Sequence, residues 1–148
     1  MKKFIGILIA VLAIAGMGIC AAETGLISLL KDLWGRVRFK SMEAPYADFT
    51  PWYVLNGMNG NHSFPSGHTA SAGMSYQLML LPVVSEKCRK YKTALFVTAF
   101  SYTSVVAFTR LVMGAHYLSD VTAGGIIAFS CVLIGMAALE KVKAASHK

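Results

Sequence analysis

Long apolar runs separated by short polar stretches dominate this 148-residue chain. The runs lie near residues 4–22, 67–85, 93–110 and 118–139, and the first contains 19 residues without a charge. An α-helix rises about 1.5 Å per residue, so a run of this length crosses most of a hydrocarbon core of about 30 Å. Apolar and polar positions do not alternate strictly, which argues against a transmembrane barrel. The pattern predicts an all-α fold, a helical transmembrane bundle with about four spans.

The spans would form one membrane domain, residues 1–148, with a long outer loop at 23–66. Aromatic and proline residues are frequent in this loop, a composition suited to the headgroup layer of a membrane. Its first part, Thr24 to Lys40, is compatible with a continuation of the first helix. The N-terminus also resembles a signal peptide, with Cys20–Ala22 as a loose cleavage site, but we favour an uncleaved span because further spans follow.

Basic residues outnumber acidic ones by 14 to 7, for a formal net charge of +7, yet only 14% of the chain is charged. So few charges argue against a soluble nucleic-acid-binding protein, which would spread them over a polar surface. With four spans, nine of the basic residues fall on one face of the membrane, which the positive-inside rule makes cytoplasmic. This predicts an integral protein of a bacterial inner membrane with both termini in the cytoplasm. The nine are Lys2, Lys3, Lys87, Arg89, Lys90, Lys92, Lys141, Lys143 and Lys148.

The other five basic residues lie on the outer side, against the rule, and call for an explanation. Arg36 and Lys40 are interpreted as ordinary solvated or headgroup-contacting charges. Lys31 and Arg38 are seven residues apart, so on a helix they would project from one side about 10 Å apart. Arg110 lies at the end of the third span. Taken by itself, it has an ordinary interpretation as a span-end residue whose side chain extends to the membrane interface.

Two histidines stand at span ends on the same outer side. In Pro65–His68, Ser66 is a candidate N-cap, and the free N–H groups of a helix start favour an anion. His116 and Asp120 are four residues apart, which would place them on one helical face. Each residue alone has an ordinary explanation, but together the cations, histidines and carboxylate predict a phosphate site. A carboxylate-held histidine can act as nucleophile or base, and His68 could protonate a departing oxygen.

These residues form three ordered motifs, Lys31-x6-Arg38, Pro65-Ser66-Gly67-His68 and Arg110-x5-His116-x3-Asp120. The set resembles the signature of the type 2 phosphatidic acid phosphatase (PAP2) superfamily, in its membrane lipid phosphatase branch. Phe39 stands where the family usually has Pro, and Thr109 where it usually has Ser. The resemblance implies that His116 is the nucleophile, Asp120 its orienting partner and His68 the acid. The phosphate would be bound by Lys31, Arg38, Ser66, Gly67 and Arg110.

The resemblance further implies a metal-independent phosphatase without a cofactor. It would hydrolyse a lipid phosphate or pyrophosphate at the outer face through a phosphohistidine intermediate. Its partners would be this substrate and membrane lipids, with no nucleic acid. The alternative is a catalytically inactive, truncated membrane interaction protein that keeps the motifs as inherited structure. A small anion transporter would explain the outer cations but not the pairing of His116 with Asp120, and the apolar spans do not fit the soluble haloperoxidase branch.

Membrane members of the family commonly have six spans, whereas here only one precedes Lys31. The chain is therefore expected to be an N-terminally shortened form, either natural or a fragment. Small residues in the spans, among them Ala70, Gly73, Gly124 and Gly125, would permit close helix packing.

Overall fold

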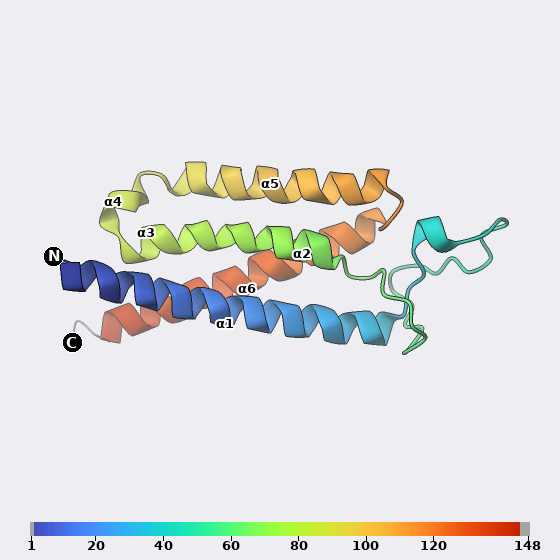
Figure 1. Cartoon of the computed structure of the whole chain (residues 1–148), viewed down its shortest axis with the longest axis horizontal. Coiled ribbons are helices and arrows are strands. Elements are labelled where there is room, and N and C mark those ends of the chain that lie inside the picture. The colour runs from blue at the N-terminus through green and yellow to red at the C-terminus, as the bar shows by residue number, and fades with distance from the viewer. Residues whose placement is uncertain (1, 146–148) are drawn as a thin grey trace.

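The computed structural model describes the backbone of residues 2–145 and the side chains of residues 12–145. Within that part of the chain all regular structure is helical, which confirms the predicted all-α bundle. Figure 1 shows long helical rods side by side, with an irregular segment at one end. The α-helices are α1 (Lys2–Trp34), α2 (Gly67–Gly73), α3 (Leu80–Val84), α4 (Glu86–Arg89), α5 (Lys92–Val112) and α6 (Leu118–Ala145), and the 3-10 helices are η1 (Phe39–Ser41) and η2 (Met74–Met79).

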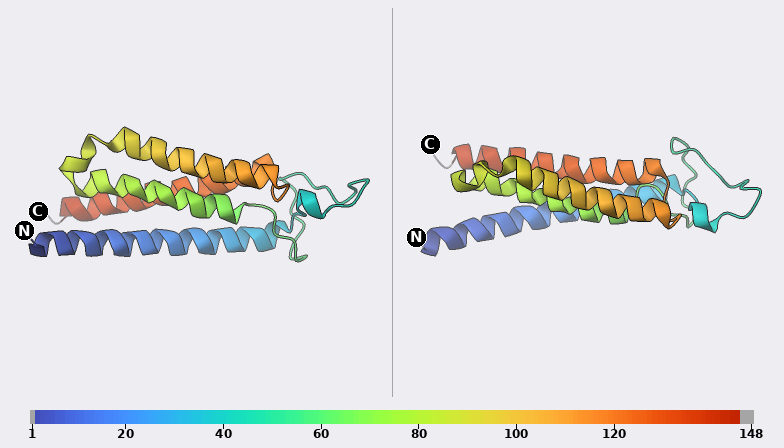
Figure 2. Two further views of the ribbon diagram at one scale, coloured as in Figure 1. Left: turned by 45° about the horizontal axis from the view of Figure 1, so that its top comes forward. Right: turned by 90° about the horizontal axis from the view of Figure 1, so that it is seen from above.

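Three helices are long and apolar enough to cross a membrane, over Leu12–Trp34, Lys92–Val112 and Leu118–Ala145. The fourth expected span, near residues 67–85, is built differently. It consists of α2, η2 and α3 in direct succession, and none of these pieces alone has the length of a span. Together they form a rod that runs beside the other helices in all three ribbon views (Figures 1 and 2).

The first helix extends well beyond the predicted span. It runs on to Trp34, so the irregular outer segment begins at residue 35 rather than 23. In hydrocarbon every backbone amide needs a partner within the chain, which favours continued helix through the polar residues of this stretch. Gly35 ends the helix in the left-handed region, with φ of 51°, and its N–H donates to the carbonyl of Lys31 at 3.1 Å. This arrangement is a common helix C-terminus, which glycine adopts without steric cost.

The rod formed by α2, η2 and α3 lies at the centre, because α2 packs on α1, α5 and α6. Its contact with α6 is close enough to require small residues. A Cβ on Gly124 would lie 2.4 Å from the backbone oxygen of Ser66, and one on Gly73 would lie 2.5 Å from the Cβ of Ala128. The small residues noted in the sequence thus serve packing within the chain. They fix the start of α2 directly against the first turns of α6.

Apolar side chains occupy both the interior and the outside of the bundle. Tyr76, Leu80 and Val132 belong to the buried core. Other apolar side chains point outward, such as Val105, which is 62% exposed, and Ile134, which is 71% exposed. Exposed apolar surface on the middle of long helices is typical of contact with lipid tails. The chain is a membrane protein by these features.

The two ends of the bundle differ in charge and in shape. The start of α1, the end of α6 and the α4 turn lie at one end, while the irregular segment and the α5–α6 turn lie at the other (Figures 1 and 2). The basic residues of 87–92 and 141–143 therefore lie at the end opposite to the irregular segment.

Candidate active site

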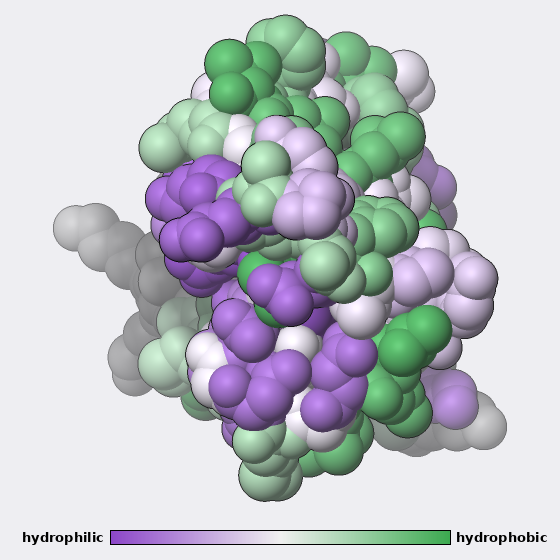
Figure 3. Space-filling model, turned by 90° about the vertical axis from the view of Figure 1, so that its right-hand side faces the viewer, coloured by the Kyte–Doolittle hydropathy of each residue, from purple (hydrophilic) through white to green (hydrophobic). Residues whose placement is uncertain are grey.

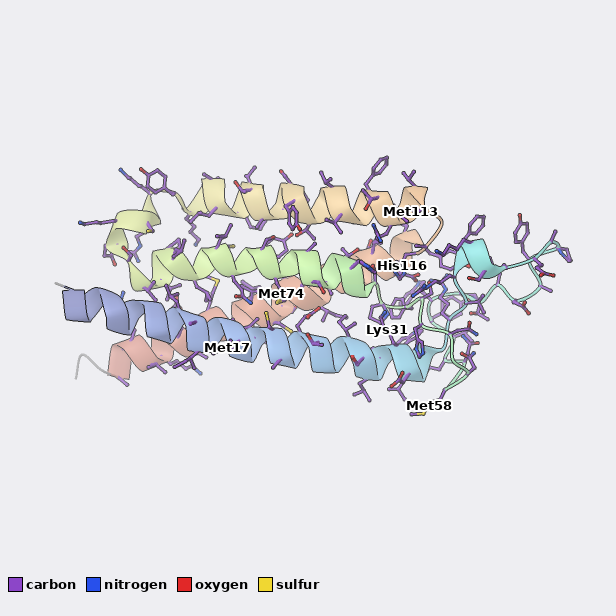
Figure 4. All side chains as sticks on the ribbon, viewed as in Figure 1. Met17, Lys31, Met58, Met74, Met113 and His116 are labelled. Atoms are coloured by element: carbon purple, nitrogen blue, oxygen red, sulfur yellow. The ribbon has the colours of Figure 1, made fainter. Side chains whose placement is uncertain are left out.

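The residues singled out in the sequence meet at the end of the bundle that carries the irregular segment. Lys31 is in the last turn of α1, Arg110 is in the last turn of α5, and Ser66 caps α2. In Figure 4 both Lys31 and His116 lie toward this end of the bundle, although they are 85 positions apart in the sequence. Seen end-on in Figure 3, this face carries a cluster of hydrophilic side chains between apolar ones. The structure thus brings the three motifs together.

Four positive or ionisable groups surround His68. Arg110, His116, Lys31 and Arg38 all lie within electrostatic range of its imidazole. His68 itself is exposed. Lys31 reaches across to the start of α2, because a Cβ on Gly67 would lie 3.4 Å from the Lys31 ammonium nitrogen.

The helical-face argument for Lys31 and Arg38 is wrong, although the two charges do act on one another. Helix α1 ends at Trp34, so Arg38 lies outside it, in extended backbone just before η1. The chain turns back at Gly35, and it is this turn that returns Arg38 to the site. A Cβ on Gly35 would lie 2.1 Å from the backbone oxygen of Gly57, so the turn requires a glycine.

Ser66 is the N-cap of α2, as predicted. Its backbone is extended, with φ of −73° and ψ of 107°, and its hydroxyl oxygen accepts from the Thr69 amide at 3.4 Å. The Thr69 hydroxyl donates to the same oxygen at 3.0 Å. Ser66 is fully buried, and its own N–H donates to the backbone carbonyl of Asp120 at 2.9 Å. This backbone bond ties the start of α2 to the start of α6, so the two histidine-bearing segments are held in register.

His116 and Asp120 lie close together, but not on one helical face as predicted. His116 lies in the turn before α6, and only Asp120 is in the helix. The carboxylate accepts a hydrogen bond from the Tyr117 N–H at 3.0 Å. The third residue of a helix often accepts in this way from the N–H of the residue that precedes the helix. This contact draws the chain back, and His116 Nδ1 lies 3.5 Å from Asp120 Oδ2.

Both members of this pair are buried, and the contact between them is long. Side-chain exposure is 2% for His116 and 0% for Asp120. His116 Nδ1 is the one buried side-chain nitrogen or oxygen that lacks a hydrogen-bond partner among residues 12–145. Hydrogen bonds in catalytic sites are often long before substrate binds and shorten in the complex. Among the described side chains, Oδ2 of Asp120 is the one carboxylate oxygen at ion-pair distance from Nδ1.

Asp120 is held from two further sides by groups that the sequence analysis did not single out. Arg36 donates to Oδ1 at 2.6 Å, and the Ser63 hydroxyl donates to Oδ2 at 2.6 Å. Ser63 is fully buried, and Arg36 is 3% exposed. The hydrogen bonds from Arg36, Ser63 and the Tyr117 amide stabilise the ionised form of the carboxylate. They also determine the position of the oxygen atom that lies near His116.

Arg36 is the main residue that the sequence interpretation missed. The sequence predicts a solvated charge, which is wrong, because Arg36 is buried. It also donates to the Thr50 carbonyl at 2.9 Å and to the Ser119 hydroxyl at 2.8 Å. Its guanidinium lies 3.9 Å from the centre of the Tyr117 ring. The sequence did contain one signal, because the predicted orientation places Arg36 on the outer side of the membrane, where basic residues are less frequent. Lys40, the other residue interpreted in this way, is exposed as expected.

Aromatic rings close the site from the side of the irregular segment. Phe49 packs edge-on against Tyr117 at 5.7 Å between ring centres, and Phe39 does so at 6.3 Å. Burial raises the pKa of the Tyr117 hydroxyl, the positive charge of Arg36 opposes this shift, and the negative charge of Asp120 supports it. The phenol therefore stays protonated and neutral beside Arg36.

The three other cations of the site have no acidic partner in the described part of the chain. Lys31, Arg38 and Arg110 form no ion pair with a carboxylate there, and each side chain is only partly buried. Converging positive charges repel one another unless an anion lies between them. No group of three His, Cys, Asp or Glu side chains with the geometry of a metal site occurs among the described residues. The arrangement fits a bound dianion such as a phosphate ester.

Comparisons with known proteins agree with the motifs. The model of the PAP2 superfamily matches residues 4–144. A lipid A 4'-phosphatase of Bacteroides thetaiotaomicron is 36% identical over 119 residues, which is 79% of this chain and 48% of that protein. A probable sphingosine-1-phosphate phosphatase of Dictyostelium discoideum is 34% identical over 79 residues, 49% of this chain and 20% of that protein. The chain thus spans about half the length of the first relative. No solved structure gives a significant match.

Proposed function

Because this chain belongs to the PAP2 superfamily, we propose that it is a phosphatase that hydrolyses a lipid phosphate or pyrophosphate. Two of its relatives bear the names of phosphatases of phosphorylated lipids. The apolar helices would hold the protein in the bilayer, where such a substrate is presented. We place the reaction at the end of the bundle that carries the irregular segment.

One observation carries the proposal. Lys31, Arg38 and Arg110 come from three segments, converge on His68 and have no carboxylate partner in the described part of the chain. A phosphate ester supplies the missing negative charge, and arginine offers a planar pair of donors that matches its oxygens. Stabilising charge on the phosphoryl oxygens is most of what a phosphoryl-transfer site must do. The positive charge that stabilises these oxygens would come from cationic side chains, so the proposed reaction needs no metal.

In the first step His116 Nε2 attacks phosphorus and the bond from phosphorus to the lipid oxygen breaks. His68, which is exposed beside the cations, donates a proton to the departing oxygen. The product of this step is a phosphohistidine on His116 and a lipid alcohol. In the second step His68 takes a proton from water, the resulting hydroxide attacks phosphorus, and the P–N bond breaks. Inorganic phosphate leaves and both histidines return to their starting state.

Asp120 would hold the proton on His116 Nδ1, so that the lone pair of Nε2 faces the substrate. Only one tautomer of the neutral ring is a nucleophile at Nε2, and the hydrogen bond made by the other nitrogen selects it. Arg36 and Ser63 then act as positioning residues, because their bonds to Asp120 determine where its oxygens lie. Neither of them needs to touch the substrate.

The same proposal gives the protein an orientation. The basic residues of 87–92 and 141–143 lie at the end opposite to the site. Such residues mark the cytoplasmic side of a bacterial inner membrane, so the active site would face outward.

The test is phosphate release by the purified chain in detergent micelles. We expect the wild type to release inorganic phosphate from a lipid phosphate, with or without a chelator, and His116→Ala to release none while remaining folded. The label from a ³²P-labelled substrate should appear on the wild type as an acid-labile, alkali-stable phosphohistidine and be absent from His116→Ala. Full activity of His116→Ala would refute the mechanism. A folded wild type that hydrolyses no lipid phosphate would instead favour the inactive interaction protein.

A further inference from the structure

A groove of about 520 Å³ runs along the centre of one side of the bundle, between α1, α2 and α5. One end of the groove is formed by Lys31, Gly67 and His68, so it joins the proposed phosphate site. From there it extends along α1 toward the middle of the membrane. Figure 1 shows the α2 segment of the rod lying between α1 and α5 on this side. The groove is therefore where the part of a lipid next to its phosphate would lie.

The walls of this groove are more polar than a surface facing lipid tails requires. Ser28, Ser71 and Tyr102, which carry hydroxyl groups, are among the residues that line it. At its far end is Glu23, a carboxyl group within the membrane-spanning part of α1. Ionisable side chains in such segments are costly and are by default candidates for a function.

Glu23 has no use in the proposed reaction and lacks a satisfying partner. It is 3% exposed, and within the described part of the chain its carboxyl group accepts a hydrogen bond only from the neighbouring Thr24 hydroxyl, at 3.3 Å. It forms no ion pair within residues 12–145. A buried carboxyl group with open acceptor positions that lines a cavity offers a binding position to a hydrogen-bond donor.

We propose that Glu23 binds a hydrogen-bond donor of the substrate lipid, a hydroxyl, amide or ammonium group carried next to the phosphate. Eight residues of helix separate Glu23 from Lys31, about 12 Å along the axis. The occupant of the groove is then the polar part of the lipid between its phosphate and its tails. This inference rests on the proposed phosphatase function and adds to it a class of substrate.

The consequence is selectivity between lipids with the same phosphate. A phosphorylated sugar lipid or a phosphorylated sphingoid base carries donors close to its phosphate ester. Phosphatidic acid has no donor beyond the phosphate itself, so it would leave Glu23 without a partner. Leaving a buried polar group of the protein unpaired in the complex is an effective way to reject a substrate.

The experiment compares two lipids on the full chain in mixed micelles. We expect the wild type to have a higher kcat/KM for sphingosine 1-phosphate than for phosphatidic acid. Glu23→Leu should lower the ratio of the two values by tenfold or more, the usual range for a lost hydrogen bond to a charged group. Glu23→Gln, which keeps a carbonyl acceptor but loses the charge, should give a smaller loss. Asp32→Asn is the matched control, because Asp32 lies on the same helix, is exposed and does not line the groove.

Three results would overturn the proposal. A ratio of the two kcat/KM values that stays unchanged in Glu23→Leu, whether or not both values fall, would show that Glu23 contacts no substrate donor. A change of the ratio in Asp32→Asn of the same size as in Glu23→Leu would show that the effect does not come from the groove. Hydrolysis of neither lipid by the folded wild type would refute the phosphatase function itself, and the subsite with it.

Discussion

The ion pair between Arg36 and Asp120 gives the sharpest test of how this site is built. Arg36→Met keeps much of the side-chain volume but removes the charge, and it leaves Asp120 buried with 0% side-chain exposure. Removing one partner of a buried pair typically costs about 3–5 kcal/mol. Asp120 would keep its hydrogen bonds from Ser63 and the Tyr117 amide. We therefore expect the free energy of unfolding to fall by about 3 kcal/mol, the lower end of this range.

Activity should separate Arg36 from Arg38, which lies two residues away and is a natural control. Arg36→Met should lower kcat at least tenfold with little change in KM, because Arg36 positions Asp120 and does not reach the phosphate. Arg38→Met should raise KM and weaken inhibition by inorganic phosphate. Since Arg38 is only partly buried and makes no ion pair in the described chain, its loss should change stability by about 0.5 kcal/mol or less.

A double-mutant cycle completes the test. Asp120→Asn removes the other charge, so the combined variant with Arg36→Met no longer contains an unpaired buried ion. We expect it to be about 2 kcal/mol more stable than the sum of the two single effects predicts, although it should remain inactive. Reversible unfolding in detergent measures all four proteins. The reasoning would be refuted by additive effects, or by Arg36→Met unfolding at the wild-type free energy.

Three further predictions follow from other contacts. Gly124→Ala places a Cβ 2.4 Å from the backbone oxygen of Ser66 and should lower the free energy of unfolding by about 1–3 kcal/mol and also lower kcat. Gly125→Ala, whose Cβ would lie 3.9 Å from the side chain of Thr69, should be tolerated in the same unfolding and rate assays, and equal effects of the two variants would contradict this. Ser63→Ala removes the 2.6 Å hydrogen bond to Asp120 and should lower the free energy of unfolding by about 1–3 kcal/mol. A variant as stable as the wild type would show that this bond does not stabilise the fold. Dialysis against a chelator should leave the rate of phosphate release unchanged, and a loss that a divalent cation restores would show that the reaction needs a metal.

The general fold could be predicted because apolar runs of membrane-spanning length are visible directly in the order of the residues. The starts of α2 and α6 agree with the predicted bounds at residues 67 and 118, but the end of α1 at Trp34 does not agree with the predicted end at residue 22. Polar residues at Glu23 and Lys31 interrupt the apolar pattern, but the helix continues through them to Trp34, because backbone hydrogen bonding outweighs the cost of single polar side chains. The interruption of the central rod by η2 also leaves no clear mark, since its sequence is compatible with an ordinary α-helix.

The candidate site was predictable in its members and not in its geometry. Order and spacing of the motif residues indicated that Lys31, His68 and His116 belong together. The reason given for their proximity was partly wrong, since turns rather than helical faces place Arg38 and His116. Arg36 escaped because its importance depends on burial and on a partner 84 residues away, neither of which local sequence reveals.

The contact of α2 with α6 determines which part of the site responds to the thickness of the bilayer. Ser66 meets Gly124 with no side chain between the two backbones, so the spacing of the histidine-bearing segments is fixed by the main chain itself. Lys31 and Arg110 stand instead in the last turns of α1 and α5, long helices whose tilt adjusts to the thickness of the surrounding hydrocarbon. A thicker or thinner membrane would therefore shift the phosphate-binding charges while the histidine pair keeps its spacing. Lipid composition would then tune the capture of substrate more strongly than the breaking of its bond.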